Sequence, residues 1–224
     1  MDLSLYFILF MIYSFFGWVM EIIFTLYKDK TLVNRGFLMG PYCPIYGSGC
    51  ILIILLLNRY LKDPIVLFIM SMVICSILEY VVSFTLEKLF KARWWDYSDR
   101  KFNINGRICL ETLIPFGLLG CLLMYVINPF ISSLVLKIPS SILNIIAIIL
   151  FIIFAIDNVV SFSIITKIHI STKDIIMDNT EEITKKVREY ISKHSRFGKR
   201  LMKSFPRLKV LKEKYKKKPK KNKK

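Results

Sequence analysis

Apolar residues fall into five long runs, separated by short polar connections. The runs cover residues 3–27, 42–61, 65–89, 108–131 and 140–167. Each is close to the roughly 20 residues that a helix needs to cross the hydrocarbon core of a bilayer. The pattern predicts an all-α, polytopic membrane helix bundle of about five transmembrane helices. The opening run has no basic segment before it and no site typical of signal cleavage, so we expect it to remain as the first helix.

The second run begins irregularly, because Pro41, Pro44, Gly47 and Gly49 fall in its first turns. Proline removes a backbone donor and glycine weakens a helix. A re-entrant entry at this point is therefore an alternative to a simple crossing.

Basic residues in the connections predict the orientation of the bundle. The connections after the first and third runs carry nine Lys and Arg, and those after the second and fourth carry three. Basic connections stay on the cytoplasmic side. We therefore expect a multi-pass protein of the bacterial plasma membrane, with the N-terminus outside and the C-terminus in the cytoplasm.

The C-terminal tail carries most of the positive charge. Residues 168–224 hold 20 Lys and Arg against 6 Asp and Glu, whereas residues 1–167 hold 13 against 10. The predicted organisation is a bundle over 1–167, basic amphipathic helices over 168–213 and a disordered lysine-rich end over 214–224. A basic tail beside a membrane favours anionic lipids as its partner over nucleic acid.

Composition argues against several classes of protein. Apolar residues make up 54% of the 224 residues, and mean hydropathy is +0.50, which is high for a soluble domain. The five cysteines form no C-x-x-C pair, and the two histidines lie in the tail, so we expect no metal site and no cofactor. No P-loop motif occurs, so ATP would have to be bound by another chain.

Carboxylates inside the apolar runs are the strongest candidates for function. They are Glu21, Glu79, Glu111 and Asp157. A charge near the bilayer centre costs about 2.5–3.5 kcal/mol on insertion scales, so such residues face a protein interior and often bind something there. The alternative is that each is a structural pin, paired with a basic residue or protonated.

Further polar residues accompany these acids. Ser83 lies one helical turn after Glu79, and Arg107, Asn103 and Asn105 lie in the connection 91–107, whose guanidinium and amide groups suit a carboxylate or phosphate. Arg35 lies in the first basic connection. The aromatic residues of 91–107 are also typical of a simple membrane-interface belt.

Six short segments resemble one bacterial family. They are Gly17-Trp18-x-x-Glu21, Asn34-Arg35-Gly36-Phe37-Leu38-x-Gly40-Pro41, Pro44-Ile45-Tyr46-Gly47-x-Gly49, Glu79-Tyr80-x-x-Ser83-x-x-x-Glu87, Trp94-Trp95-Asp96-Tyr97 and Phe102-Asn103-Ile104-Asn105-Gly106-Arg107. Over residues 5–165 the chain resembles the CmpB-like integral membrane proteins, described as type IV ABC-transporter permeases. The resemblance implies a permease-like membrane subunit that works with a separate ATPase. It supplies no substrate and no catalytic residues.

We therefore expect a permease-like protein with a cytoplasm-facing polar cavity, lined by the four carboxylates and with Arg35, Arg107 and Asn105 at its mouth. One alternative is a membrane enzyme acting on lipid headgroups, with Glu111 as general base and Arg107 holding a phosphate. Another is a non-catalytic anchor or assembly protein. The residues contain no recognisable catalytic constellation, which argues against an enzyme, and assembly with further copies of the chain stays open.

Overall fold

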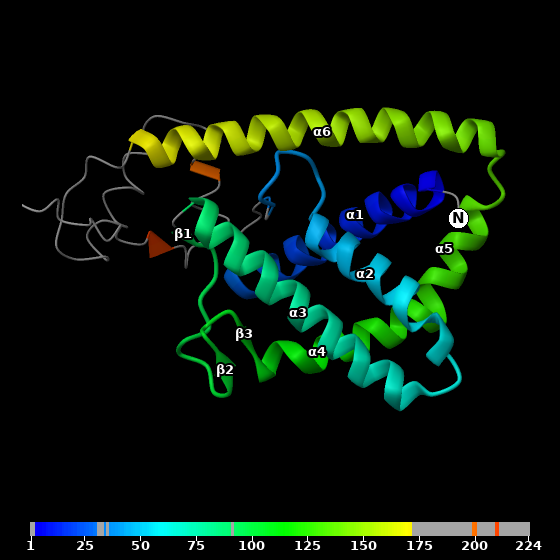
Figure 1. Ribbon diagram of the computed structural model, residues 1–224, viewed down its shortest axis with the longest axis horizontal. Helices are drawn as coiled ribbons and strands as arrows, with labels where there is room; N and C mark the ends of the chain where they lie inside the picture. The colour runs from blue at the N-terminus through cyan, green and yellow to red at the C-terminus, as the bar shows by residue number, and fades with distance from the viewer. Residues whose placement is uncertain are drawn as a thin grey trace, which may run out of the picture.

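The structure is a computed structural model that describes residues 3–30, 34, 36–90, 92–171, 199–200 and 209–210 (Figure 1). Its helical elements are α1 (Leu3–Asp29), α2 (Pro44–Leu57), the 3₁₀ turn η1 (Asn58–Tyr60), α3 (Pro64–Phe90), α4 (Leu110–Leu122), the π-helical turn η2 (Leu123–Ile127), α5 (Asn128–Val135) and α6 (Ser140–Ser171). Two-residue strands form two small pairs. They are β1 (Ala92–Arg93) with β4 (Lys209–Val210), and β2 (Asn103–Ile104) with β3 (Ile108–Cys109).

The apolar runs form helices at the predicted places. Four described helical stretches are long and apolar enough to cross a bilayer, namely Leu3–Tyr27, Pro64–Phe90, Leu110–Val135 and Ser140–Thr166. A fifth apolar helix, Pro44–Tyr60, is shorter because residues 36–43 form a loop. The prediction of an all-α polytopic membrane bundle of about five helices is confirmed.

The helices pack as neighbours in a sequence-ordered bundle. α1 packs on α2 and α6, and α3 packs on α2 and α4. Glycines allow the closest approaches: Gly47 of α2 faces Ser14 of α1, and Gly120 of α4 faces Ser71 of α3. Small residues at helix contacts are typical of membrane bundles, where close van der Waals packing holds helices together.

α6 lies along one side of the bundle, above α1 in Figure 1. Its isoleucines are largely exposed, including Ile145, Ile149, Ile152 and Ile156, each more than half accessible. An apolar exposed face is what a helix at the lipid boundary needs. α6 therefore presents a broad surface to the hydrocarbon.

Elements that hold the candidate residues gather at one end of the bundle. Figure 1 shows the last turns of α1, α3 and α6, the first turn of α4 and the β2–β3 hairpin at the left. The N-terminus and the α5–α6 connection lie at the right. The connections between helices therefore lie alternately at the two ends of the bundle, as the charge pattern predicts. Which end faces the cytoplasm stays a prediction.

The predicted tail segments lie mostly outside the described residues. This applies to the amphipathic helices expected within 168–213 and to the end 214–224. Within the described part, α6 continues to Ser171, and β4 pairs with β1 so that Ala92 lies opposite Val210.

Candidate functional site

Glu79 is the most deeply placed carboxylate with incomplete hydrogen bonding. It lies on α3 about three helical turns before Phe90, and only 8% of it is exposed. Its Oε1 accepts a hydrogen bond from the hydroxyl of Tyr97, at 3.3 Å. Its Oε2 is buried and has no hydrogen-bond partner among the described residues. A buried, half-satisfied carboxylate is costly unless something else supplies the missing partner.

Glu21 of α1 lies nearby, and it too contacts a tyrosine. The hydroxyl of Tyr46, on α2, donates to Oε1 of Glu21 at 2.5 Å. The backbone carbonyl of Glu21 accepts from Thr25, which is buried one turn later in α1. Each of these two acids therefore faces a phenol from a different segment of the chain.

Tyr97 bonds to Glu79 and is also affected by the charge of Glu21. Burial first, then the charge of Glu79 and, more weakly, that of Glu21, raise the pKa of Tyr97. The charges of both carboxylates therefore act on this phenol. The backbone amide of Tyr97 donates to the carbonyl of Gly106 at 2.8 Å, which fixes the phenol on the hairpin. Glu21, Glu79, Tyr46 and Tyr97 form one group, called here the tyrosine–carboxylate cluster.

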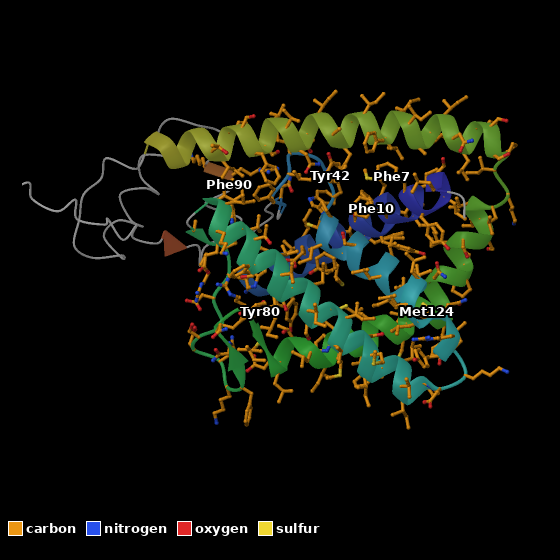
Figure 2. The ribbon with its side chains drawn as sticks, in the orientation of Figure 1. Phe7, Phe10, Tyr42, Tyr80, Phe90 and Met124 are labelled. Carbon is orange, nitrogen blue, oxygen red and sulfur yellow. The ribbon has the colours of Figure 1, made fainter. Side chains whose placement is uncertain are left out.

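Asp157 has a different role, because its carboxylate is fully engaged. It accepts from the amides of Met39 and Gly40 at 2.9 and 2.7 Å, from the hydroxyl of Tyr42 at 2.5 Å and from Ser161 at 2.8 Å. Figure 2 shows Tyr42 just beneath α6. Asp157 thus fastens the loop 36–43 to α6.

Arg200 contacts the same loop through its carbonyls. Its guanidinium donates to the carbonyl oxygens of Gly36, Leu38 and Met39, at 3.2, 2.7 and 3.3 Å. Asp157 accepts hydrogen bonds from amides of this loop, and Arg200 donates hydrogen bonds to its carbonyls. Together they satisfy backbone groups that a loop near the membrane would otherwise leave without partners.

Arg107 is buried beside Glu87. Nη1 of Arg107 lies 2.9 Å from Oε2 of Glu87 and 3.3 Å from Oγ of Ser83. Nε of Arg93 lies 2.9 Å from the same Glu87 oxygen. The Arg107 guanidinium also stacks near the ring of Tyr80, at 5.5 Å. The two arginines therefore neutralise Glu87, and Arg107 joins the end of α3 to the hairpin.

Asn103 and Asn105 build the hairpin itself. The Asn103 amide donates to the carbonyl of Arg100, and its oxygen accepts from the amide of Gly106. Asn105 and Gly106 both have positive φ, at 52° and 64°, and the amide of Arg107 donates to the carbonyl of Ile104. Two central residues with positive φ are the requirement of a type I′ turn, which Asn-Gly fits best. Asn105 also donates to the hydroxyl of Tyr80, which Figure 2 shows near this end of the bundle.

Glu111 lies apart from the other acids. It occupies the first turn of α4, where it is exposed, and its Oε2 lies 2.9 Å from Nη1 of Arg100. Arg35 lies outside the described residues. Thus the structure places Glu21 and Glu79 in one cluster, joins Arg107 directly to both Ser83 and Glu87, and places Asp157 and Glu111 elsewhere. Among the described residues, no group of three metal-ligating side chains comes together.

Sequence reasoning missed the partners of the acids. They are Tyr42, Tyr46 and Tyr97. It also did not identify Glu87 as the partner of Arg107. A signal was present, since a tyrosine hydroxyl near membrane depth needs an acceptor. The position of a tyrosine in the chain did not indicate which acid would accept the hydrogen bond from its hydroxyl.

These features define a polytopic α-helical membrane protein with a tyrosine–carboxylate cluster near one end. The sequence model of one family, described as "Putative ABC-transporter type IV" (ABC_trans_CmpB), matches residues 8–162, and the chain belongs to that family. The match includes every residue of the cluster. Searches of curated proteins and of solved structures returned no match.

Proposed function

We propose that this chain is a permease-like membrane subunit that works with a separate ATPase. Its polar binding site opens toward the cytoplasm and is formed by the tyrosine–carboxylate cluster. The observation that carries the proposal is Glu79, buried within α3 with one carboxylate oxygen lacking a partner among the described residues. Ionisable groups at such depth usually serve a transported species or its path. Membership of the transporter family supports the same function.

The other predicted residues support this site in different ways. Asp157 fixes the loop 36–43. Arg107 with Ser83 fixes the β2–β3 hairpin, to which the amide of Tyr97 is bonded. Asn105, on the turn of that hairpin, lies toward the proposed mouth. Arg35 is proposed at the mouth from its position in the sequence.

The proposed setting is the bacterial plasma membrane, with the hairpin end in the cytoplasm. Lys and Arg concentrate in the connections at that end, which is the distribution expected on the inner side. The basic tail would then lie beside anionic lipid headgroups. Since the sequence contains no P-loop, the energy of ATP would come through a partner chain.

Purification of the tagged full chain in mild detergent tests the proposed partner. We expect an ATPase with a P-loop to co-purify and its hydrolysis rate in vesicles to depend on this chain. Glu79→Gln should reduce ATP-driven solute flux at least tenfold, whereas Glu111→Gln, at an exposed surface pair, should leave it unchanged. Absence of any ATPase together with no flux would contradict the proposal.

The lipid-handling alternative has less support. It requires Arg107 to hold a phosphate, but Arg107 and Arg93 both contact Glu87. It also uses Glu111 as a base, and Glu111 pairs with Arg100 at the surface. A phosphate would have to displace a buried ion pair, at a cost of several kcal/mol.

A further inference from the structure

Two consecutive peptide groups of the loop before α2 join Asp157 to Arg200. In the first, the amide of Met39 donates to Asp157 at 2.9 Å, and the carbonyl of Leu38 accepts from Arg200 at 2.7 Å. In the second, the amide of Gly40 donates to Asp157 at 2.7 Å, and the carbonyl of Met39 accepts from Arg200 at 3.3 Å. The N–H and C=O of a trans peptide point in opposite directions. The loop therefore has the carboxylate on one side and the guanidinium on the other.

This arrangement turns the negative ends of the peptide dipoles toward the guanidinium. An amide that donates to a carboxylate polarises its peptide group, which makes the carbonyl a stronger acceptor. The charge of Asp157 therefore acts on Arg200 through the loop 36–43. Burial lowers the pKa of Arg200 below its usual range, and the charge of Asp157 opposes that decrease. The side of the loop that Arg200 contacts is thus suited to a cation.

The loop carbonyls match a guanidinium in particular. Nη2 of Arg200 donates to the carbonyls of Gly36 and Leu38. Nη1 donates to the carbonyl of Met39. Two different nitrogens are used, and a guanidinium holds its nitrogens in one rigid plane. An ammonium group has a single nitrogen and does not reproduce this fork. The loop therefore distinguishes cations by shape as well as by charge.

The loop 36–43 also has contacts of its own that hold its shape. The side chain of Leu38 is buried and packs with Met11 and Tyr42 in an apolar cluster. Asp157 holds the amides on the opposite side. These contacts orient the carbonyls independently of the guanidinium, which lowers the cost of binding a cation there. Loss of the Arg200 side chain should therefore leave the site formed and vacant.

We propose that the loop 36–43 is a binding site for a guanidinium group, and that Arg200 of the tail is its tethered occupant. The ligands are the carbonyl oxygens of Gly36, Leu38 and Met39. The site shares no residue with the tyrosine–carboxylate cluster, so the inference goes beyond the proposed function. A solute that carries a guanidinium group has to displace Arg200. Binding of such a solute and docking of the tail therefore oppose each other.

Chemical rescue of Arg200→Ala in the detergent-purified full chain tests this proposal. The probe is ethylguanidinium chloride, because this cation corresponds to the part of the side chain that the substitution removes. We expect the Tm of Arg200→Ala to lie at least about 2 °C below that of the unchanged protein. Ethylguanidinium should restore it in a saturable way, since a ligand stabilises the state that binds it. Ethylammonium chloride at equal ionic strength is the reference and should restore little.

The unchanged protein should show no rise in Tm over the same concentrations, because its site is occupied. A tethered group acts at an effective concentration on the order of millimolar, which a free solute has to exceed. Lys199→Ala is the matched control. Lys199 is the adjacent, exposed residue, so this variant loses one positive charge of the tail but keeps the guanidinium. It should behave like the unchanged protein.

Arg200→Lys keeps the charge and loses the fork, so it should also gain stability from ethylguanidinium. This variant carries the test if Arg200→Ala does not fold, and the absence of a rise in it would then overturn the inference. An Arg200→Ala protein that folds and gains no stability would do the same. Equal rises with ethylguanidinium and ethylammonium, or equal rises in Lys199→Ala and Arg200→Ala, would also contradict a guanidinium site at this loop.

Discussion

The phenol oxygen of Tyr42 lies 2.5 Å from Oδ2 of Asp157, although the two residues are 115 positions apart in the chain. Tyr42 belongs to the loop before α2, and Asp157 belongs to α6. The same carboxylate binds two amides of that loop. Since α6 otherwise packs mainly on α1, this contact is a polar attachment of the last helix to the bundle.

Replacing Asp157 should lower the free energy of unfolding, because this carboxylate holds the loop 36–43 on α6. In Asp157→Ala the amides of Met39 and Gly40 and the Tyr42 hydroxyl lose their acceptor. Hydrogen bonds to a charged group contribute about 1.5–3 kcal/mol each at most, so we expect a loss of about 2–4 kcal/mol in the free energy of unfolding. Thermal unfolding in detergent measures it. Ser163→Ala, on the exposed side of α6, is the control and should change little. Equal stability of the two variants would show that the loop is held by other contacts.

Alkaline pH should weaken this attachment. Burial, the hydrogen bond to Asp157 and the Asp157 charge raise the pKa of Tyr42 above its ordinary value. A group whose folded-state pKa is raised stabilises the fold fully below its unfolded pKa, about 10, and loses that contribution as pH rises beyond it.

The measurement compares Tm between pH 8 and pH 11 for the unchanged protein and Tyr42→Phe. The variant should be less stable at pH 8 and should decline less steeply above pH 10. Part of the decline should persist, because the pKa of Tyr97 is raised as well. Parallel curves for the two proteins would argue against a contribution from Tyr42.

Two arginines of the hairpin region should differ sharply in their contribution to the stability of the fold. Arg107 is paired with Glu87 and its side chain is 7% exposed. Removing one partner of a buried pair costs about 3–5 kcal/mol, and we expect Arg107→Ala to fall at the low end because Arg93 also contacts Glu87. Arg100 pairs with Glu111 at the surface, so Arg100→Ala should cost less than about 1 kcal/mol. Hydrogen exchange of the backbone amides of residues 92–109 measures how readily this region opens in each variant. Similar protection in both variants would contradict this ranking.

Two glycines of α2 form a matched pair for testing helix packing. A Cβ at Gly47 would collide with Ser14 and with the backbone carbonyl of Phe10. We expect Gly47→Ala to cost about 1–3 kcal/mol through overpacking between α1 and α2. A Cβ at Gly49 would make ordinary contacts, 3.6 Å from Leu78. Gly49→Ala should be neutral or stabilise by up to about 1 kcal/mol. Chemical unfolding in detergent compares them, and a reversed order would refute the close α1–α2 contact.

The helices could be predicted because a bilayer imposes one length on them. The run 65–89 became α3 over Pro64–Phe90 almost unchanged. The fourth run contains the π-helical turn Leu123–Ile127, which hydropathy does not reveal. Pro129 follows that turn, and a proline removes a backbone donor and crowds the carbonyl four residues earlier. The π-helical turn therefore has a local cause, Pro129, which the hydropathy of the run does not reveal.

The candidate site was predictable only in part. The depth of Glu79 follows from its place in an apolar run. Its partner Tyr97 is 18 positions away and depends on how the hairpin folds back onto α3. That hairpin has a strong local signal in Asn105-Gly106, which we interpreted as binding chemistry and not as a turn. Tertiary contacts of this kind have no periodicity, so a single sequence does not specify them.

The short α2 has a consequence for the surrounding lipid. α2 and η1 together contain 14 and 3 residues, about 26 Å of helix, whereas α1 and α3 contain 27 each, about 40 Å. The hydrocarbon layer is about 30 Å thick. Acyl chains beside the exposed Leu55 and Leu56 of α2 must therefore shorten, while those beside α3 are stretched or meet a tilted helix. Hydrophobic mismatch acts in opposite senses on the two sides of this protein, which makes its tilt sensitive to the thickness of the membrane.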